Sequence, residues 1–167
     1  MHSEAYFAGG CFWCITPVFE KTEGVISVRC GYSGGDEIFP SYEDVKHQRT
    51  GHRETLKIEY DESIVSFDTL LDIFLADIDP YDAGGQFIDR GHSYTLAVYY
   101  QSEREKSCTE QKIRRLRKET GREVFISVEC FKSFYEAEEY HQDYYLKNPE
   151  AFENELIESG RKVIKLN

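Results

Sequence analysis

Two cysteines three residues apart are the first side chains in this sequence that could carry chemistry. Cys11 and Cys14 stand in the stretch YFAGGCFWCITPVF, behind a Gly-Gly pair. A pair with this spacing can exchange disulfides, bind a metal ion or supply a nucleophile with a neighbouring thiol. Structural zinc sites need four ligands, and the sequence has no second Cys-x-x-Cys pair. We therefore expect no metal at this motif.

The residues around the cysteines predict that Cys11 lies at the start of a helix. Residues 4–9 predict a short strand that ends at the glycines, and residues 11–21 predict the helix. A helix N-terminus carries partial positive charge and unpaired N–H groups, and both stabilise a thiolate. We therefore expect a lowered pKa for the Cys11 thiol, which is the candidate nucleophile. Cys14 is expected on the same helix face as Cys11. It is either a second reactive thiol or a small apolar side chain buried in the core.

Phe12 and Trp13 distinguish this motif from an ordinary dithiol exchanger. Exchangers of the thioredoxin type usually carry proline beside the second cysteine, whereas here two large aromatic residues separate the cysteines. Such a pair favours the wall of a small apolar pocket, and plain core packing of one ring is the alternative. A general dithiol oxidoreductase that acts on protein disulfides stays open as a rival class.

The composition describes an acidic chain of one-domain size. Its 167 residues carry a formal net charge of -11 at pH 7. Nucleic acid is therefore not expected as a partner, because phosphate contacts need a basic face. Five cysteines in irregular spacing do not form a secreted disulfide framework, and neither a signal-peptide pattern nor a membrane-length apolar run is present. We expect a soluble, cytoplasmic, monomeric protein.

Hydrophobic periodicity and turn residues divide the chain into interleaved strands and helices. Ser66 and Ser102 precede helical repeats and are candidate N-caps. The segments 33–52 and 79–93 are predicted to be long loops, which are often functional. The predicted strands are 4–9, 25–32, 53–60, 94–100 and 124–131, and the predicted helices are 11–21, 67–78, 103–120 and 136–148, the last ended by Pro149.

These elements predict a fold of the α/β or α+β class. We expect a two-layer sandwich, with a mixed sheet and packed helices, that places the catalytic cysteine at a helix N-terminus. One catalytic domain is expected over residues 1–167. Periodicity fixes neither the strand order nor the structure after residue 150.

Six sequence blocks stand in an order that is specific to one family. They are GCFWC at 10–14, GYSGG at 31–35, PSYEDV at 40–45, TGHRE at 50–54, DPYDAGGQFIDRGHSY at 79–94 and EAEEYHQDYYLKNP at 136–149. This ordered set resembles the A-type peptide methionine sulfoxide reductases. The resemblance covers a core of about 4–150 and leaves 151–167 as a C-terminal tail.

The resemblance implies an activity and a set of site residues. The activity is the reduction of methionine S-sulfoxide, free or in oxidised proteins, to methionine, with no bound metal or organic cofactor. Carried over position by position, the resemblance implies Cys11 as nucleophile and Glu54 as the acid that protonates the sulfoxide oxygen. It also implies that the phenols of Tyr42 and Tyr94 bind this oxygen and that Phe12 and Trp13 form the walls around the substrate methyl group. Asp89 is implied as the family's site aspartate.

The chemistry of a sulfoxide agrees with these roles. Its sulfur is a poor electrophile until its oxygen accepts a proton, so Glu54 must stay protonated near neutral pH. Burial in an aromatic pocket raises a carboxyl pKa and would achieve this. Attack by Cys11 then gives methionine and a cysteine sulfenic acid. A second thiol condenses with it to a disulfide, which an external reductant such as thioredoxin, glutaredoxin or a small thiol reduces.

The source of the second thiol is where this chain departs from the family pattern. Many members have glycine at the position of Cys14 and recycling cysteines near the C-terminus, whereas residues 151–167 hold no cysteine. Cys14 is the candidate resolving residue by distance, with an external thiol as the alternative. A non-catalytic sulfoxide-binding or redox-sensing module is a third functional class. The remaining cysteines, Cys30, Cys108 and Cys130, are expected to be packing residues.

Overall fold

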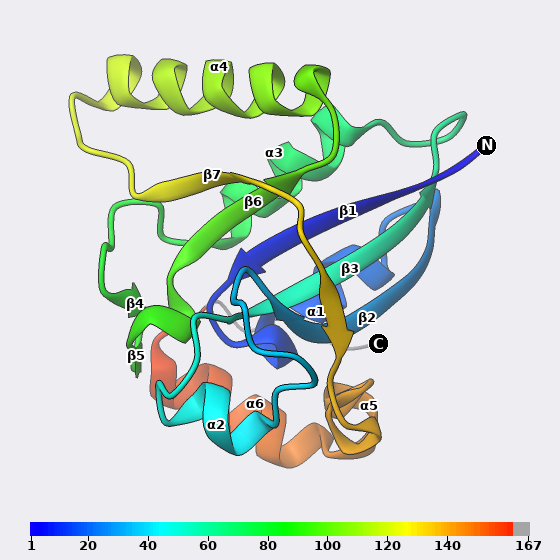
Figure 1. Cartoon of the computed structure of the whole chain (residues 1–167), viewed down its shortest axis with the longest axis vertical. Coiled ribbons are helices and arrows are strands. Elements are labelled where there is room, and N and C mark those ends of the chain that lie inside the picture. The colour runs from blue at the N-terminus through cyan, green and yellow to red at the C-terminus, as the bar shows by residue number, and fades with distance from the viewer. Residues whose placement is uncertain (162–167) are drawn as a thin grey trace.

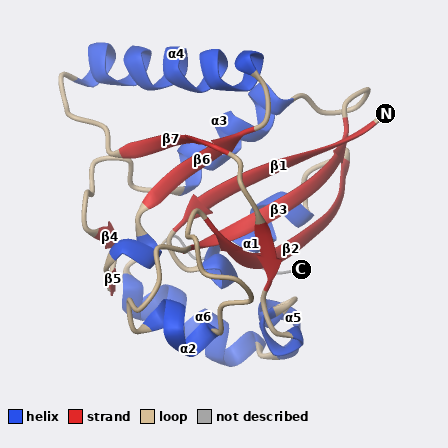
Figure 2. Ribbon diagram, viewed as in Figure 1, coloured by secondary structure: helices blue, strands red, loops and turns tan. Residues whose placement is uncertain are grey.

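A computed structural model describes residues 1–161 of the chain as an α+β fold (Figure 1). Six strands form one mixed sheet in the order β7-β6-β1-β3-β2-β8, and β4 and β5 form a separate ribbon (Figure 2). The strands are β1 His2–Gly9, β2 Val25–Ser33, β3 Arg53–Asp61, β4 Gly85–Gln86, β5 Asp89–Arg90, β6 Leu96–Tyr100, β7 Ile126–Cys130 and β8 Phe134–Glu136. The helices are α1 Phe12–Glu20, α2 Tyr42–Lys46, α3 Phe67–Asp77, α4 Glu103–Thr120, α5 Tyr144–Lys147 and α6 Pro149–Ser159, with short 3-10 helices η1 at His92–Tyr94 and η2 at Glu139–His141.

The sheet is antiparallel except at one edge. β1 lies between β3 and β6 and is antiparallel to both, and β2 is antiparallel to β3 and β8. β6 and β7 are parallel, which requires the crossover that α4 supplies between them. In Figure 1, α4 lies along one end of the molecule, and α2, α5 and α6 gather at the other. The predicted mixed sheet with packed helices is therefore confirmed.

Alternation along β1 shows why the sheet has two different faces. Ala5 and Phe7 point into the core formed with α1 and α3, where the Phe7 and Phe74 rings stack at 4.9 Å. Tyr6 points to the opposite face and stacks on Phe131 at 4.1 Å between ring centroids. Successive side chains of a strand must point to opposite faces, so one face carries the helices and the other an aromatic cluster.

Most predicted elements are confirmed, and the serine caps explain two of them. The Ser66 hydroxyl accepts from the backbone N–H of Thr69 and the Ser102 hydroxyl from that of Glu105, which fixes the starts of α3 and α4. β6 begins two residues later than predicted, because Tyr94 belongs to η1. Within residues 1–161, no helix is both long and apolar enough to cross a membrane.

The predicted helix over 136–148 is wrong. This segment holds the end of β8, the short η2 and the single turn of α5. The side chain of Gln142 holds the chain open, because it accepts from the backbone N–H of Cys30 at 2.8 Å and donates to the Cys30 carbonyl at 2.9 Å. It thus replaces a strand partner on the edge of β2, and Asp143 then takes a left-handed conformation with φ 53°.

Pro149 begins a helix rather than ending one. It occupies the first turn of α6, where a missing backbone N–H costs nothing. Phe152 and Leu156 are buried against the two cysteines of the GCFWC motif. The predicted tail 151–167 therefore contains a helix that covers the site, and residues 162–167 lie outside the described part.

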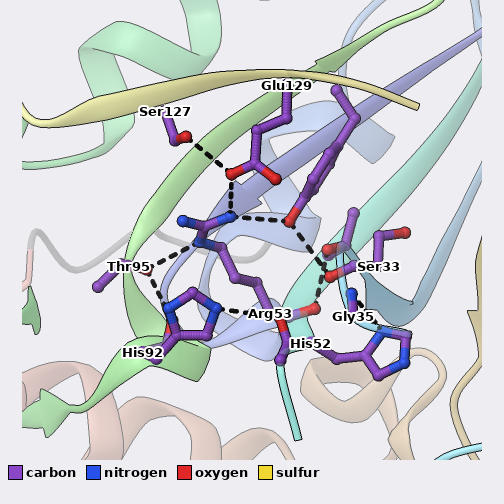
Figure 3. A network of polar contacts seen from close by, with 11 residues as sticks. Ser33, Gly35, His52, Arg53, His92, Thr95, Ser127 and Glu129 are labelled. Atoms are coloured by element: carbon purple, nitrogen blue, oxygen red, sulfur yellow. Dashed lines mark hydrogen bonds and ion pairs between the residues drawn. The ribbon is translucent and has the colours of Figure 1, made fainter. Parts of the chain in front are cut away.

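A polar network beside β3 ties together strands and loops that carry site residues. Figure 3 shows Arg53 between Thr95 and Glu129. The Arg53 guanidinium donates to Thr95 Oγ1 at 2.8 Å, to Glu129 Oε2 at 2.6 Å and to the Tyr99 hydroxyl at 3.2 Å. Because Arg53 precedes Glu54 and Thr95 follows Tyr94, this network fixes two predicted site residues relative to one another.

Replacement of Arg53 by methionine should lower stability markedly. The change leaves the carboxylate of Glu129, which is 35% exposed, without its ion-pair partner, and loss of one partner of such a partly buried pair costs about 1–3 kcal/mol. Urea unfolding followed by circular dichroism measures the loss. Arg49→Met is the matched control, since its exposed ion pair with Asp44 contributes little. Equal unfolding midpoints for the two variants would contradict the importance of the network.

Candidate active site

Cys11 caps the start of α1, directly after the end of β1. Gly10, which joins them, has φ +85°, and a Cβ there would lie 2.7 Å from the Cβ of Gln86. Only glycine fits this left-handed turn at such close approach. The Gly9-Gly10 pair therefore lets the chain turn from the end of β1 directly into α1. This places Cys11 at the helix N-terminus, as the sequence predicts.

A cavity of about 190 Å³ opens onto Cys11. Six of the eight predicted site residues line it, together with two that were not predicted. They come from separate elements, because α1, α2, β3, β5, η1 and α6 all end or pass here. The lining residues are Cys11, Trp13, Tyr42, Lys46, Glu54, Asp89, Tyr94 and Glu155.

Glu54 is the buried acid of this cavity. Its side chain is 1% exposed, and one carboxyl oxygen accepts from the backbone N–H of Phe12 at 3.1 Å. Burial raises its pKa to about 8, with further increases from the charges of Asp89 and Glu155, against the opposing effect of the Phe12 hydrogen bond. Glu54 is therefore mainly protonated at pH 7 and can donate a proton into the cavity.

Tyr42 and Tyr94 present phenols to the same cavity. Burial raises the pKa of both, and the negative charge of Glu54 raises it further. Both hydroxyls therefore remain protonated across the physiological range. Two phenol donors and one carboxylic acid around a small cavity suit a substrate oxygen that gains negative charge during reaction.

Trp13 is held in place by two neighbours. Its indole Nε1 donates to Nδ1 of His141 at 3.1 Å, and its ring stacks on Tyr144 with centroids 4.0 Å apart. Burial lowers the pKa of His141 to about 4, so this ring is neutral at pH 7 and can accept the indole proton. The indole face is thereby fixed as one apolar wall of the cavity.

Phe12 lies behind this wall instead of forming part of it. Its side chain is fully buried and is not among the described residues that line the cavity. The ring packs near Tyr32, Tyr42 and His141, with centroids 6.0, 6.5 and 5.2 Å away. The structure thus places Phe12 in the core, which was the alternative interpretation for one of the two aromatic residues.

The Cys11 thiol does not have the lowered pKa expected at a helix N-terminus. Its pKa is raised by the hydrogen bond with Cys14, by burial, and by the nearby charges of Glu54 and Asp89. The N–H of Phe12, which a thiolate at this position could use, is taken by Glu54. These tertiary neighbours outweigh the partial charge of the helix end and favour the neutral form of the Cys11 thiol.

Cys14 is adjacent to Cys11 and is covered by α6. Its side chain is 4% exposed and packs with Cys11, Phe152 and Leu156. The two sulfur atoms and a carboxyl oxygen of Glu155 lie within 4.8 Å of one another. Three ligand atoms are one fewer than the closed set of a structural zinc site, whereas two adjacent thiols suit disulfide formation.

The other cysteines differ from one another in their surroundings. Cys30 is 1% exposed in the core, as expected of a packing residue. Cys108 is partly buried and its thiol donates to Asp68 at 3.2 Å. Cys130 is exposed, because it stands at the end of β7, which is an edge strand of the sheet. Its prediction as a packing residue is therefore wrong.

Comparisons with known proteins agree with this geometry. The family model described as peptide methionine sulfoxide reductase matches residues 3–166. A relative named peptide methionine sulfoxide reductase MsrA, from Bacillus licheniformis, is 40% identical over 160 residues, which cover 95% of this chain and 88% of the relative. One of the same name from Ligilactobacillus salivarius is 45% identical over 150 residues, covering 89% and 87%. The chain belongs to the peptide methionine sulfoxide reductase family.

Solved structures show that the fold of this reductase is shared. The reduced form of Mxr1 from Saccharomyces cerevisiae superposes with a TM-score of 0.83 at 27% identity, covering 89% of this chain and 87% of that one. Methionine sulfoxide reductase A of Corynebacterium diphtheriae gives a TM-score of 0.80 at 27% identity, covering 89% and 76%. The predicted resemblance and enzyme class are confirmed: the protein is an oxidoreductase that acts on methionine sulfoxide and repairs oxidised methionine.

Two residues that line the reductase site, Lys46 and Glu155, were not predicted, and His141 was assigned no chemistry. Lys46 lies one turn after Tyr42 in α2, a spacing that could have placed it on the same face. His141 lies inside a family-like block, but only its contacts with Trp13 and Tyr42 reveal that it positions them. Glu155 belongs to the unassigned tail, and no spacing in the sequence relates it to the cysteines.

Proposed function

We propose that this reductase removes oxygen from methionine S-sulfoxide through a Cys11 sulfenic acid and then a Cys11–Cys14 disulfide. The observation that carries the proposal is the buried, protonated acid Glu54 in the same small cavity as the Cys11 thiol. The apolar face of Trp13 suits the substrate methyl group. Tyr42, Tyr94 and Glu54 suit its oxygen. We place Asp89 at the rim, where burial raises its pKa and the charge of Arg161 opposes that increase.

The first step transfers one oxygen atom. The Cys11 sulfur attacks the substrate sulfur while Glu54 gives its proton to the sulfoxide oxygen, and the thiol proton restores Glu54. The oxygen then passes to the Cys11 sulfur: the sulfur–oxygen bond of the substrate and the sulfur–sulfur bond formed by the attack both break, a bond forms between Cys11 sulfur and that oxygen, and methionine leaves. The substrate sulfur is reduced by two electrons, and Cys11 is oxidised by two electrons to the sulfenic acid.

The second and third steps restore the thiols. Cys14 attacks the sulfenic sulfur, water leaves, and the disulfide forms. An external dithiol then reduces this disulfide. We further propose that the protein works as one catalytic domain over 1–167 and as a cytoplasmic monomer. Yeast Mxr1, which this chain resembles in its reduced form, has also been solved in complex with Trx2, which supports thioredoxin as the class of reductant.

A single-turnover experiment tests the proposal. Fully reduced protein is mixed with methionine S-sulfoxide without reductant, methionine is quantified, and the cysteines are mapped by intact and peptide mass spectrometry. One methionine per chain with a Cys11–Cys14 disulfide is the expected result. Methionine with one oxygen on Cys11 would make the resolving thiol external. No methionine would refute the proposed reaction.

Substitution of Cys14 by serine should separate the two halves of the cycle. The variant should still form one methionine per chain, with a sulfenic acid on Cys11 that dimedone traps. Steady-state turnover with thioredoxin should fall by about tenfold or more, because the disulfide that thioredoxin reduces no longer forms. Cys130→Ser is the matched control, since Cys130 is exposed and does not line the cavity. Undiminished turnover of the Cys14 variant would exclude Cys14 as the resolving residue.

An insulin-reduction assay separates this function from a general dithiol oxidoreductase. Attack on a protein disulfide needs a thiolate, and the pKa of the Cys11 thiol is raised by Cys14 and by burial. We expect no insulin reduction above that of an unrelated thiol protein.

A further inference from the structure

Glu155 is a carboxyl group of the cavity to which the proposed chemistry gives no role. It lies on α6, one turn after Phe152 and beside Leu156, and both of these pack against the cysteines. This packing fixes the helix face that points at the dithiol. The carboxylate is thereby brought next to a buried thiol pair, where an acidic group opposes thiolate formation unless it takes part in proton transfer.

The distances place Glu155 next to both of the sulfurs that must react with one another. One of its carboxyl oxygens, the Cys11 sulfur and the Cys14 sulfur all lie within 4.8 Å of each other. A triangle of this size is closed by small side-chain rotations or by one bridging water. No other carboxyl group among residues 1–161 joins both sulfurs in such a cluster.

Disulfide formation requires a proton to move across the same triangle. The Cys14 thiol must lose its proton to become a nucleophile, and the hydroxyl of the Cys11 sulfenic acid must gain one to leave as water. Glu54 is poorly suited to accept the Cys14 proton, because burial keeps it protonated and one of its carboxyl oxygens already accepts the N–H of Phe12. A second carboxylate is therefore needed on the Cys14 side.

We propose that Glu155 is the general base and acid of the resolving step, a catalytic residue that carries the proton from Cys14 to the departing hydroxyl of Cys11. Its carboxylate takes the Cys14 proton as the sulfur–sulfur bond forms. The sulfur–oxygen bond of the sulfenic acid breaks, and Glu155 gives the proton to the leaving oxygen, which departs as water. The Cys14 sulfur is formally oxidised by one electron and the Cys11 sulfur reduced by one, so no further reactant is needed.

The surroundings of Glu155 make its carboxylate a stronger base than it would be in water. Burial and the charges of Asp89 and Glu158 raise its pKa, and the ammonium of Lys46 opposes that increase. A base is most effective when its pKa approaches the working pH. The charged and titratable groups that face it from the packed elements are Cys11, Cys14, Lys46, Glu54, Asp89, Tyr144 and Glu158.

This inference rests on the proposed function, and one experiment distinguishes the two. Glu155→Gln keeps the size of the side chain and removes its basicity. In single turnover, the variant should still release one methionine per chain, while the rate of disulfide formation falls at least about tenfold and a dimedone-reactive sulfenic acid accumulates. Glu153→Gln, an exposed substitution in the same helix, is the control and should match the unmodified protein.

A pH series excludes a merely structural effect. In the unmodified protein, the rate of disulfide formation should rise with pH as Glu155 ionises. In Glu155→Gln the rate should stay low and should not show that rise, and Glu155→Asp should recover part of the rate. Disulfide formation at an undiminished rate in Glu155→Gln would overturn the role of Glu155. Absence of methionine, or of the disulfide, in the unmodified protein would overturn the proposed cycle and this role with it.

Discussion

Substitution of Cys11 by serine abolishes methionine formation, with an expected loss of roughly 10⁴-fold or more. A hydroxyl is a far weaker nucleophile than a thiol, and it cannot form the sulfenic acid that the second step consumes. The change is nearly isosteric, and it leaves the N-cap of α1 in place. The fold should therefore survive, which a thermal unfolding curve checks directly.

The measurement is the amount of methionine released with saturating dithiothreitol. Cys30→Ser would disturb the core, so Cys130→Ser is the better matched control, and it should keep full activity. Residual activity of the Cys11 variant near that of the control would end the assignment of Cys11 as nucleophile.

Replacement of Glu54 by glutamine should slow the first chemical step by about 10²- to 10⁴-fold, which is the usual contribution of a positioned general acid. Glutamine still offers an oxygen to the N–H of Phe12, so the start of α1 should keep its geometry. The rate constant of methionine formation in single turnover measures the effect. Glu59→Gln, at the far end of the same strand, is the control. If Glu54→Gln reacts as fast as the control, the proton comes from another group.

The same substitution should change the pH dependence of both rate and stability. Protonated Glu54 is the active form, so the rate of the unmodified protein should fall as pH rises through about 8, and this fall should be absent in Glu54→Gln. The pKa in the unfolded chain is about 4.3, so the folded state holds the proton more tightly. The stability that this proton contributes is fully present below about 4.3 and is lost as pH rises through about 8. Urea midpoints at pH 6 and pH 9 should therefore differ less in Glu54→Gln.

The parts of the fold that were predictable are those set by local pattern. The glycine pair and the apolar repeat after it place Cys11 at a helix start, and alternation along 53–60 places Glu54 in a strand. The serine caps mark α3 and α4. These signals act within a few residues along the chain, so periodicity and capping suffice to find them.

The parts that were missed depend on contacts between distant segments. Gln142 replaces a strand partner of Cys30, so the segment around it cannot form the helix that its own sequence favours. The raised pKa of Cys11 comes from Cys14, Glu54 and Asp89, which converge only in the folded chain. Glu155 reaches the site through the packing of α6, and nothing in the local pattern of the tail points to the cysteines.

The cover that α6 forms over the dithiol has a consequence for the newly made chain. Residues 11–14 leave the ribosome long before residues 149–159 are translated, and β1 also waits for β3 and β6, its neighbours in the sheet. Until the last helix docks, both thiols are open to oxidants and to non-native pairing with Cys30 or Cys108. Docking of α6 therefore ends a period of chemical vulnerability that begins when the two cysteines leave the ribosome.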